Sequence, residues 1–265
     1  MDNTEKLQHS HNHWVTTMGA WFPGKKVMFR NKDLHRDLKD MEWMELYLFS
    51  ITGRTFSPEE MKVFHAMWMY TSFPDPRLWN NRVAALAGTT RSTATLALAS
   101  GVAVSEASIY GHRPNTRTID YFLRTKAKLD NGAQLIDCIK DEFKKYRTIF
   151  GFGRPLNRDD ERNPHFLEVL AETGMIDGPH LKIALETEKL LLAGRWRMRA
   201  NLTGLAGAVA ADIGLSPREH HLFLTPCFIA GMPPCYLDTR EKPEGTFFPV
   251  KCDDIHYQGV EKRSW

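Results

Sequence analysis

The segment YGHRPN at residues 110–115 places a phenol and an imidazole two residues apart, just before an expected helix. Because imidazole titrates near neutral pH, His112 is a candidate for acid/base catalysis. A solvent-exposed turn shaped by the proline and asparagine is the other interpretation of this segment, and both remain open.

A second junction, GFGRPLNRDDER at residues 151–162, combines glycines with three arginines. Glycine permits close approach of the backbone, and the guanidinium groups of Arg154, Arg158 and Arg162 are fork-shaped donors that suit carboxylates or phosphates. This spacing favours an anion site. The alternative is a solvated loop in which the arginines pair with the adjacent aspartates.

A third junction leads into an apolar helix expected to begin near Leu202. Asn201 and Thr203 flank that start, and free backbone N–H groups at a helix N-terminus favour negative charge. A solvated basic face is the alternative. The basic residues before the helix are Arg195, Arg197 and Arg199.

The elements that must position these junctions are helices, because apolar residues recur at three- and four-residue steps. Ser57, Pro58 and Glu60 form a helix start, and the stripe that follows predicts a buried face. An earlier helix is expected to open at Asp40 and to end at Gly53 in a left-handed conformation, forming a hairpin with the next. The stripe residues are Met61, Phe64, Met67 and Trp68.

Residues 82–108 are rich in Ala, Gly, Ser and Thr, and such small residues let helices approach closely. The stretch therefore predicts one long or two consecutive helices, at the centre of the fold or at a subunit interface. Residues 235–265 show little periodicity and predict an extended tail. An all-α fold of about ten helices follows. Further helices are expected at 116–129, 132–146, 164–172, 179–192, 202–213 and 217–230.

Composition narrows the function classes. The chain has 265 residues, 42% of them hydrophobic, and a formal net charge of +3, so it can bury a sizeable core and shows no basic excess typical of nucleic-acid binders. No apolar run approaches the roughly 20 residues that cross a bilayer. The first residues lack the pattern of a secretory signal, so we expect a cytoplasmic protein with neither nucleic acid nor membrane as partner.

Cysteine and histidine spacing gives no clear metal motif. The four cysteines lack CxxC spacing, and we expect reduced, mostly buried thiols. A polar leading segment carries three histidines that could chelate a metal, but we expect it to be disordered and without a chemical role. The cysteines are Cys138, Cys227, Cys235 and Cys252, and the histidines are His9, His11 and His13.

The order of these segments resembles the citrate synthase superfamily, including the short citryl-CoA lyases and the corresponding module of ATP citrate lyase. The resemblance spans residues 27–257. The opening VMFRNKDLHRDLKDMEWMELYLFSITGRTFSPEE looks like the family's opening, GFGR resembles its GFGH, and DDER resembles its DPR. The segment ANLTGLAGAVAADIGLSPRE resembles the family's NVDFYSG segment, with Asn201 matching, and FPVKCDDIHY is similar to the lyase module's closing tail.

The resemblance implies an all-α, citrate synthase-like fold with a large helical domain and a smaller helical domain over a cleft. The large domain would comprise residues 27–115 and 201–265, the latter with the C-terminal tail. The small domain would comprise residues 116–200 and close over the cleft, excluding water. A homodimer is also implied.

The family's catalytic positions are altered in this chain. Where relatives carry two histidines and an aspartate, the aligned residues are Tyr110, Arg154 and Thr203. A threonine hydroxyl cannot replace a carboxylate base at neutral pH. The resemblance then leaves Tyr110 as enolate stabiliser, Arg154 as a clamp for a substrate carboxylate, and His112 as acid/base.

Two functions are therefore weighed. One is a carbon–carbon bond lyase or synthase that acts on an acyl-CoA and an oxo or hydroxy carboxylic acid, of citryl-CoA lyase type, with no tightly bound cofactor and a coenzyme A thioester as substrate. The other is an inactive or repurposed dimer that binds an anionic ligand or partner; a different chemistry without coenzyme A is a third possibility. The substrate-binding candidates are Arg82, near the family's upstream histidine, Arg113, Asn115, Arg158 and Asn201.

Overall fold

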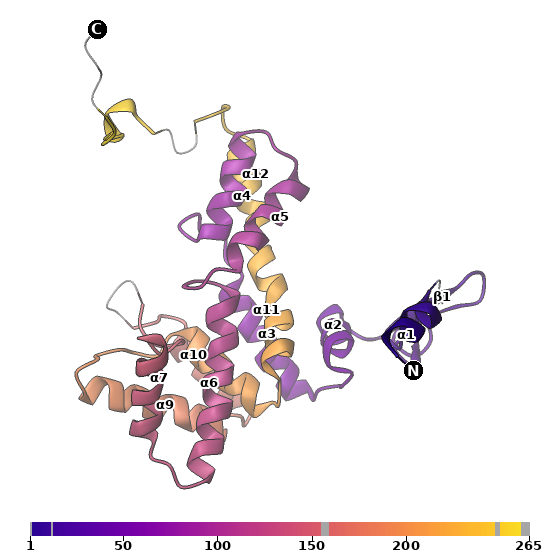
Figure 1. Ribbon diagram of the computed structural model, residues 1–265, viewed down its shortest axis with the longest axis horizontal. Coiled ribbons are helices and arrows are strands. Elements are labelled where there is room, and N and C mark those ends of the chain that lie inside the picture. Colours follow the sequence, from indigo (N-terminus) through magenta and orange to yellow (C-terminus); the bar gives the residue numbers. More distant parts are fainter. Residues whose placement is uncertain (1, 12, 155–158, 247–249, 261–265) are drawn as a thin grey trace.

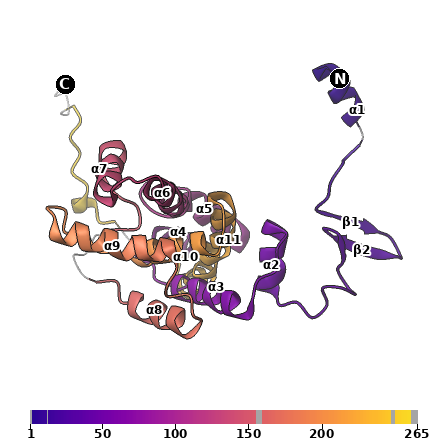
Figure 2. The same ribbon diagram turned by 90° about the horizontal axis from the view of Figure 1, so that it is seen from below.

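The protein is helical throughout its body, as the sequence predicts. The computed structural model describes residues 2–11, 13–154, 159–246 and 250–260. Figure 1 and Figure 2 show the helices gathered into one elongated body, with an N-terminal arm projecting from it. The helices of the body are α2 (Trp43–Thr52), α3 (Pro58–Thr71), α4 (Trp79–Thr89), α5 (Ala94–Ser105), α6 (His112–Asp130), α7 (Leu135–Tyr146), α8 (Asn163–Glu172), α9 (Pro179–Ala193), α10 (Leu202–Asp212), α11 (Pro217–Ala230) and α12 (Met232–Arg240).

The N-terminal arm corrects two expectations. The leading segment, expected to be disordered, forms helix α1 (Asn3–Ser10), because Asp2 and Glu5 close a reciprocal capping box at its start. An antiparallel sheet that the sequence analysis did not predict follows, in the order β1 (Gly19–Phe22), β2 (Lys26–Phe29) and β3 (Lys32–Asp33). Figure 2 shows α1 and this sheet standing away from the body.

The first helices of the body follow their predicted signals with one shift. Ser57 and Glu60 form the expected capping box of α3, and Gly53 ends α2 with φ 74°. Helix α2 does not open at Asp40, because Glu42 and Glu45 form a second capping box that fixes its start at Trp43. The predicted α3 stripe is confirmed: Phe64 and Met67 are fully buried, while Met61 and Trp68 pack against the same core.

The small-residue stretch forms two helices, α4 and α5, which pack with α12 into a second, smaller core. A side chain at Gly88 would collide with Thr239, and one at Gly101 would collide with Met232. The expectation of an extended chain from residue 235 is therefore wrong for α12. Its Thr239 hydroxyl donates a 2.6 Å hydrogen bond to the Ala85 carbonyl and holds α12 against α4.

Helix α11 contains Pro226, which has no backbone N–H and frees a carbonyl one turn earlier. The Tyr47 hydroxyl donates to that carbonyl, on Leu222, at 2.8 Å. The Trp68 indole donates to the next carbonyl, on Phe223, at 3.0 Å. Helices α2 and α3 are thus joined to α11 through two neighbouring carbonyls, one of which Pro226 leaves free.

The remaining helices match their predicted ranges to within a residue or two, except at two starts. Helix α6 begins at His112 rather than at residue 116, and α7 begins at Leu135 rather than at residue 132. The proposed domain boundary between residues 115 and 116 therefore falls inside α6. Cys138, Cys227 and Cys235 are buried free thiols, while the side chain of Cys252 lies outside the described residues. In the described ranges, no helix has the length and apolarity needed to cross a membrane.

Helix α10 lies in the main core, where it packs against α6 and α9. The backbone at its start forms hydrogen bonds with the backbone of the segment that follows α7, at residues 151–153. The Asn201 amide donates to the Gly151 carbonyl at 3.0 Å, and the Gly153 amide donates to the Arg199 carbonyl at 2.7 Å. A side chain on Gly204 would collide with the Gly151 carbonyl. The second and third junctions of the sequence are therefore one structural unit.

Replacing Gly204 by alanine tests that contact. In an ordinary helix interior this change stabilises by roughly 0.5–1 kcal/mol. Here we expect the free energy of unfolding to fall by about 1–3 kcal/mol, because the added methyl group must push the Gly151 backbone away. Denaturant titration of Gly204→Ala and the wild type measures the change in the free energy of unfolding. A stabilised variant would contradict the close approach.

Candidate functional site

The first junction is the segment at residues 110–115. It is held by a short β-bridge between Glu106 and Gly111, directly before α6. Gly111 has φ 92°, and any side chain there would collide with the Ser105 carbonyl. Only glycine fits this turn without strain. The bridge fixes Tyr110 at its end and His112 at the first position of α6.

Tyr110 is held as a hydrogen-bond donor. Its hydroxyl donates to Asn80 Oδ1 at 3.2 Å, and Asn80 is itself fixed by donating from Nδ2 to the Phe228 carbonyl at 2.7 Å. Burial raises the pKa of Tyr110 to about 12, although the nearby Arg162 guanidinium acts in the opposite direction. The phenol is therefore protonated at neutral pH.

His112 is buried, with 1% of its surface exposed, so the interpretation of an exposed turn histidine is wrong. Its ring lies 4.4 Å from the ring centroids of both His221 and Phe228. Its Nδ1 atom has no hydrogen-bond partner among the described residues. Burial, assisted by the charge of His221, lowers the pKa of His112 to about 4, so its imidazole is neutral at pH 7.

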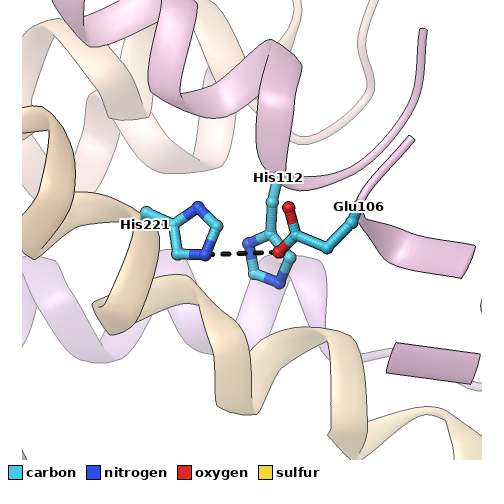
Figure 3. A group of neighbouring side chains, drawn as sticks. All are labelled: Glu106, His112 and His221. Atoms are coloured by element: carbon cyan, nitrogen blue, oxygen red, sulfur yellow. Dashed lines mark ion pairs between the residues drawn. The ribbon is translucent and has the colours of Figure 1, made fainter. Parts of the chain in front are cut away.

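Glu106 and His221 belong to the same group, and the sequence analysis missed both (Figure 3). His221 Nε2 lies 3.3 Å from a Glu106 carboxylate oxygen, and His221 Nδ1 lies 3.4 Å from the Thr116 hydroxyl. The neighbouring His220 is fully buried, and neither of its ring nitrogens has a partner in the described structure. No local spacing could have revealed this group, because α11 meets the start of α6 only in the folded chain.

Asp160 is the centre of the second and third junctions. Its carboxylate accepts from Arg162 at 2.8 and 2.7 Å and from the Leu202 backbone amide at 2.9 Å. Burial alone would raise its pKa, but the Arg162 hydrogen bonds and charge, together with the Leu202 amide, lower it to about 2. The expected pairing of an arginine with an adjacent aspartate is present between Arg162 and Asp160, but Asp160 is only 1% exposed, so the loop is not solvated at this residue.

Arg154, expected to clamp a substrate carboxylate, already holds one. It donates to the two Glu161 carboxylate oxygens at 2.7 and 3.3 Å and to the Asp159 carbonyl at 2.9 Å. Glu161 is exposed, so this pair sits at the surface of the junction. Arg158 lies outside the described residues.

The other candidates have structural partners of their own. Asn201 caps α10, and its Nδ2 donates to the Gly153 carbonyl at 2.9 Å. Asn115 Nδ2 donates to the Gly111 carbonyl, and exposed Arg113 donates to the Ser108 hydroxyl, both at 3.0 Å. Arg82 donates to the Pro76 carbonyl at 3.2 Å.

The structure thus forms two groups of candidates. Tyr110 and His112 lie at the first, with the charge of Arg162 reaching Tyr110 from the second. Arg154 and Asn201 lie at the second. Thr203 is half-buried in the first turn of α10, next to the second group.

Of the three arginines before α10, exposed Arg199 pairs with Asp159 at 2.8 Å. Arg195 lies over the Trp196 ring, 5.5 Å from its centroid, and Arg197 has a left-handed backbone with φ 51°. All three are exposed, which supports the solvated basic face rather than an anion site.

Removing the Asp160 charge tests the second junction. Asp160→Asn should lower the free energy of unfolding at pH 7 by about 2 kcal/mol, because Arg162 and the α10 amide lose a charged acceptor. The folded pKa lies below the ordinary value of 3.8, so this stabilisation is complete above pH 3.8 and is lost as the pH falls toward 2. Urea titrations at pH 7 and pH 3 measure it, and an equal difference between the two proteins at both pH values would contradict the role of the charge.

Comparison with known proteins gives a fold-level match. No protein-family model and no curated protein sequence matches the chain. Its structure is similar to citryl-CoA lyase from Hydrogenobacter thermophilus, with a TM-score of 0.81 and 15% sequence identity over 96% of this chain and 97% of that one.

Longer proteins contain the same arrangement. ATP citrate lyase from Methanothrix soehngenii, solved with citrate and coenzyme A, matches with a TM-score of 0.76 and 17% identity over 99% of this chain and 45% of that chain. Citrate synthase from Thermoplasma acidophilum, solved with carboxymethyl coenzyme A and oxaloacetate, matches with a TM-score of 0.66 and 17% identity over 85% of this chain and 59% of that one. The chain therefore has the all-α citrate synthase-like fold.

Proposed function

We propose that this protein forms or breaks a carbon–carbon bond between an acyl-CoA thioester and an oxo or hydroxy carboxylic acid. Its fold matches a citryl-CoA lyase along nearly the whole of both chains. Similar structures hold citrate with coenzyme A, or oxaloacetate with a coenzyme A derivative. We extend these ligand classes to this chain as a proposal, with no tightly bound cofactor.

The observation that carries the proposal is the setting of Tyr110. Its proton is retained at neutral pH and is donated to Asn80 Oδ1, and the positive charge of Arg162 lies nearby. When this single O–H turns from Asn80 to the substrate, a donor beside a cation stabilises an oxygen that gains negative charge in the transition state. The enolate oxygen of a thioester is such an oxygen.

In the cleavage direction, a base removes the proton of the substrate hydroxyl, and the bond to the thioester α-carbon breaks. The electron pair moves into the thioester enolate, whose α-carbon then takes up a proton. We assign the base to His112, which follows Tyr110 by two residues; its imidazole is unprotonated at pH 7, and burial makes it a weaker base than an exposed histidine. Thr203, at the position of the family's aspartate, has no part in proton transfer under this assignment.

Arg154 would hold the acid substrate. Glu161 occupies the guanidinium with a carboxylate, and because Glu161 is exposed, a substrate carboxylate can replace it without leaving Arg154 unpaired. Exposed Arg82 and Arg113 are further candidates for substrate contacts, as is Arg158. Asn115 and Asn201 would shape the site, since their amides already bind backbone carbonyls.

A second function is favoured by the Arg154–Glu161 pair and by Thr203. An internal carboxylate on Arg154 together with a missing carboxylate base suits a repurposed protein that binds an anionic ligand or partner without turnover. Such a protein would bind citrate or a coenzyme A thioester and release no product.

We also propose that the protein is a cytoplasmic homodimer with a small domain at residues 116–200 closing over a cleft. The exposed apolar side chains on α4, α5 and α12 support the dimer, since each would lose water contact in an interface. They are Leu86, Leu96 and Leu237. Light scattering of the full chain tests it, and a monomer at all concentrations would contradict it.

Turnover of citryl-CoA, or of acetyl-CoA with oxaloacetate, tests the main proposal. Tyr110→Phe should lower kcat about 10²–10³-fold, because one donor to the enolate oxygen is lost while the ring packing is kept. The matched control is Tyr146→Phe, which removes a hydroxyl at the end of α7 and should leave kcat unchanged.

Arg154→Ala should abolish turnover without unfolding the protein. In the cleavage direction, acetyl-CoA and oxaloacetate are the measured products, and in the reverse direction they are the substrates whose loss is measured. Multiple turnovers by the wild-type chain would contradict the second function, a binding protein without turnover. Ligand binding with no turnover supports it, and Tyr110→Phe with the same kcat as wild type would remove Tyr110 from the site.

A further inference from the structure

Three side chains from separate elements form a potential ligand set for a cation. Glu106 lies just after α5, His112 is the first residue of α6, and His221 lies in α11. One potential ligand atom from each, a carboxylate oxygen or a ring nitrogen, lies within 4.8 Å of the other two. Figure 3 shows the three side chains turned toward one another.

We propose that Glu106, His112 and His221 bind one divalent transition-metal ion of the zinc class. Two imidazoles and one carboxylate form a common set of protein ligands for Zn²⁺, with a solvent molecule in the fourth position. Mg²⁺ and Ca²⁺ prefer sets made of oxygen atoms alone, so two nitrogen ligands disfavour them.

The strongest independent observation is the Nδ1 atom of His112. It is buried, it belongs to a side chain that is 1% exposed, and no described residue offers it a hydrogen bond. A buried polar atom without a partner is costly, and a bound ion near His112 would give this ring a partner.

The other two ligands are already oriented. His221 Nδ1 lies 3.4 Å from the Thr116 hydroxyl, which turns Nε2 toward the Glu106 carboxylate at 3.3 Å. Such a contact to the second ring nitrogen is the usual way in which a protein orients a histidine ligand. The bridge between Glu106 and Gly111 fixes the backbone of the carboxylate ligand.

The charge and access of the group also suit an ion. The Glu106 carboxylate would neutralise half of a divalent charge, and its side chain is half-exposed, which leaves a path from solvent.

This site goes beyond the proposed function and does not depend on it. An ion on His112 would prevent that ring from accepting a proton, so a chain that holds the ion would not carry out the proposed acid/base step, and a chain without it could. Binding is therefore measured directly, without any activity assay.

Isothermal titration calorimetry of the chelator-treated full chain with Zn²⁺ tests the proposal. The three histidines near the N-terminus could bind zinc by themselves, so the titration uses a background with His9→Asn, His11→Asn and His13→Asn. We expect one Zn²⁺ per chain in this background, and a thermal unfolding midpoint that rises with Zn²⁺ but not with Mg²⁺.

Glu106→Gln and His221→Ala should each weaken Zn²⁺ binding by at least about 10-fold. Glu106 is half-exposed, so Glu106→Gln keeps the fold and remains informative if the histidine variant does not. The control His165→Ala removes an exposed histidine of α8 and should bind as the background does.

Visible absorption of the cobalt(II) protein gives a second readout. A four-coordinate spectrum that Glu106→Gln abolishes supports the site. A background that binds no Zn²⁺, or Zn²⁺ binding that is unchanged in both Glu106→Gln and His221→Ala, would overturn the proposal.

Discussion

The second junction depends on the hydrogen bonds that the buried carboxylate of Asp160 accepts. It joins the Arg162 guanidinium to the backbone amide that opens α10, so the loop, the helix start and the positive charge near Tyr110 are fixed together. A carboxylate at a helix N-terminus also satisfies free amides and the helix dipole. The close approach of Gly151 and Gly204 then completes the unit, because no side chain separates the two backbones.

Burial governs the chemistry of the first junction. Removing Tyr110 and His112 from water favours their neutral forms, so at pH 7 the pair offers a phenol that donates and an imidazole that can accept. The same two properties suit an enolate stabiliser with a base, and an imidazole that is ready to bind a metal. The two proposals therefore compete for one ring, His112, and differ in whether it exchanges a proton or holds an ion.

Sequence signals within one helical turn predicted where the helices begin and end, but they could not predict contacts between residues far apart in the chain. Ser57 with Glu60 and the glycine at residue 53 marked helix ends correctly, because capping depends on residues within one turn. The contact of His221 with Glu106 joins residues more than a hundred positions apart, and no spacing encodes it. Likewise the arginine of GFGR was recognised as a carboxylate ligand, while its actual partner, Glu161, becomes visible only in the folded loop. The N-terminal sheet was missed because its strands are only two to four residues long.

A crystal structure with coenzyme A and oxaloacetate tests the proposed function most directly. The account predicts both ligands between the first and second junctions, with the carboxylate of the acid on Arg154 in place of Glu161 and the thiol end of coenzyme A facing the Tyr110 hydroxyl. An unchanged Arg154–Glu161 pair, with no ligand between Tyr110, His112 and Arg154 at saturating concentrations, would contradict it.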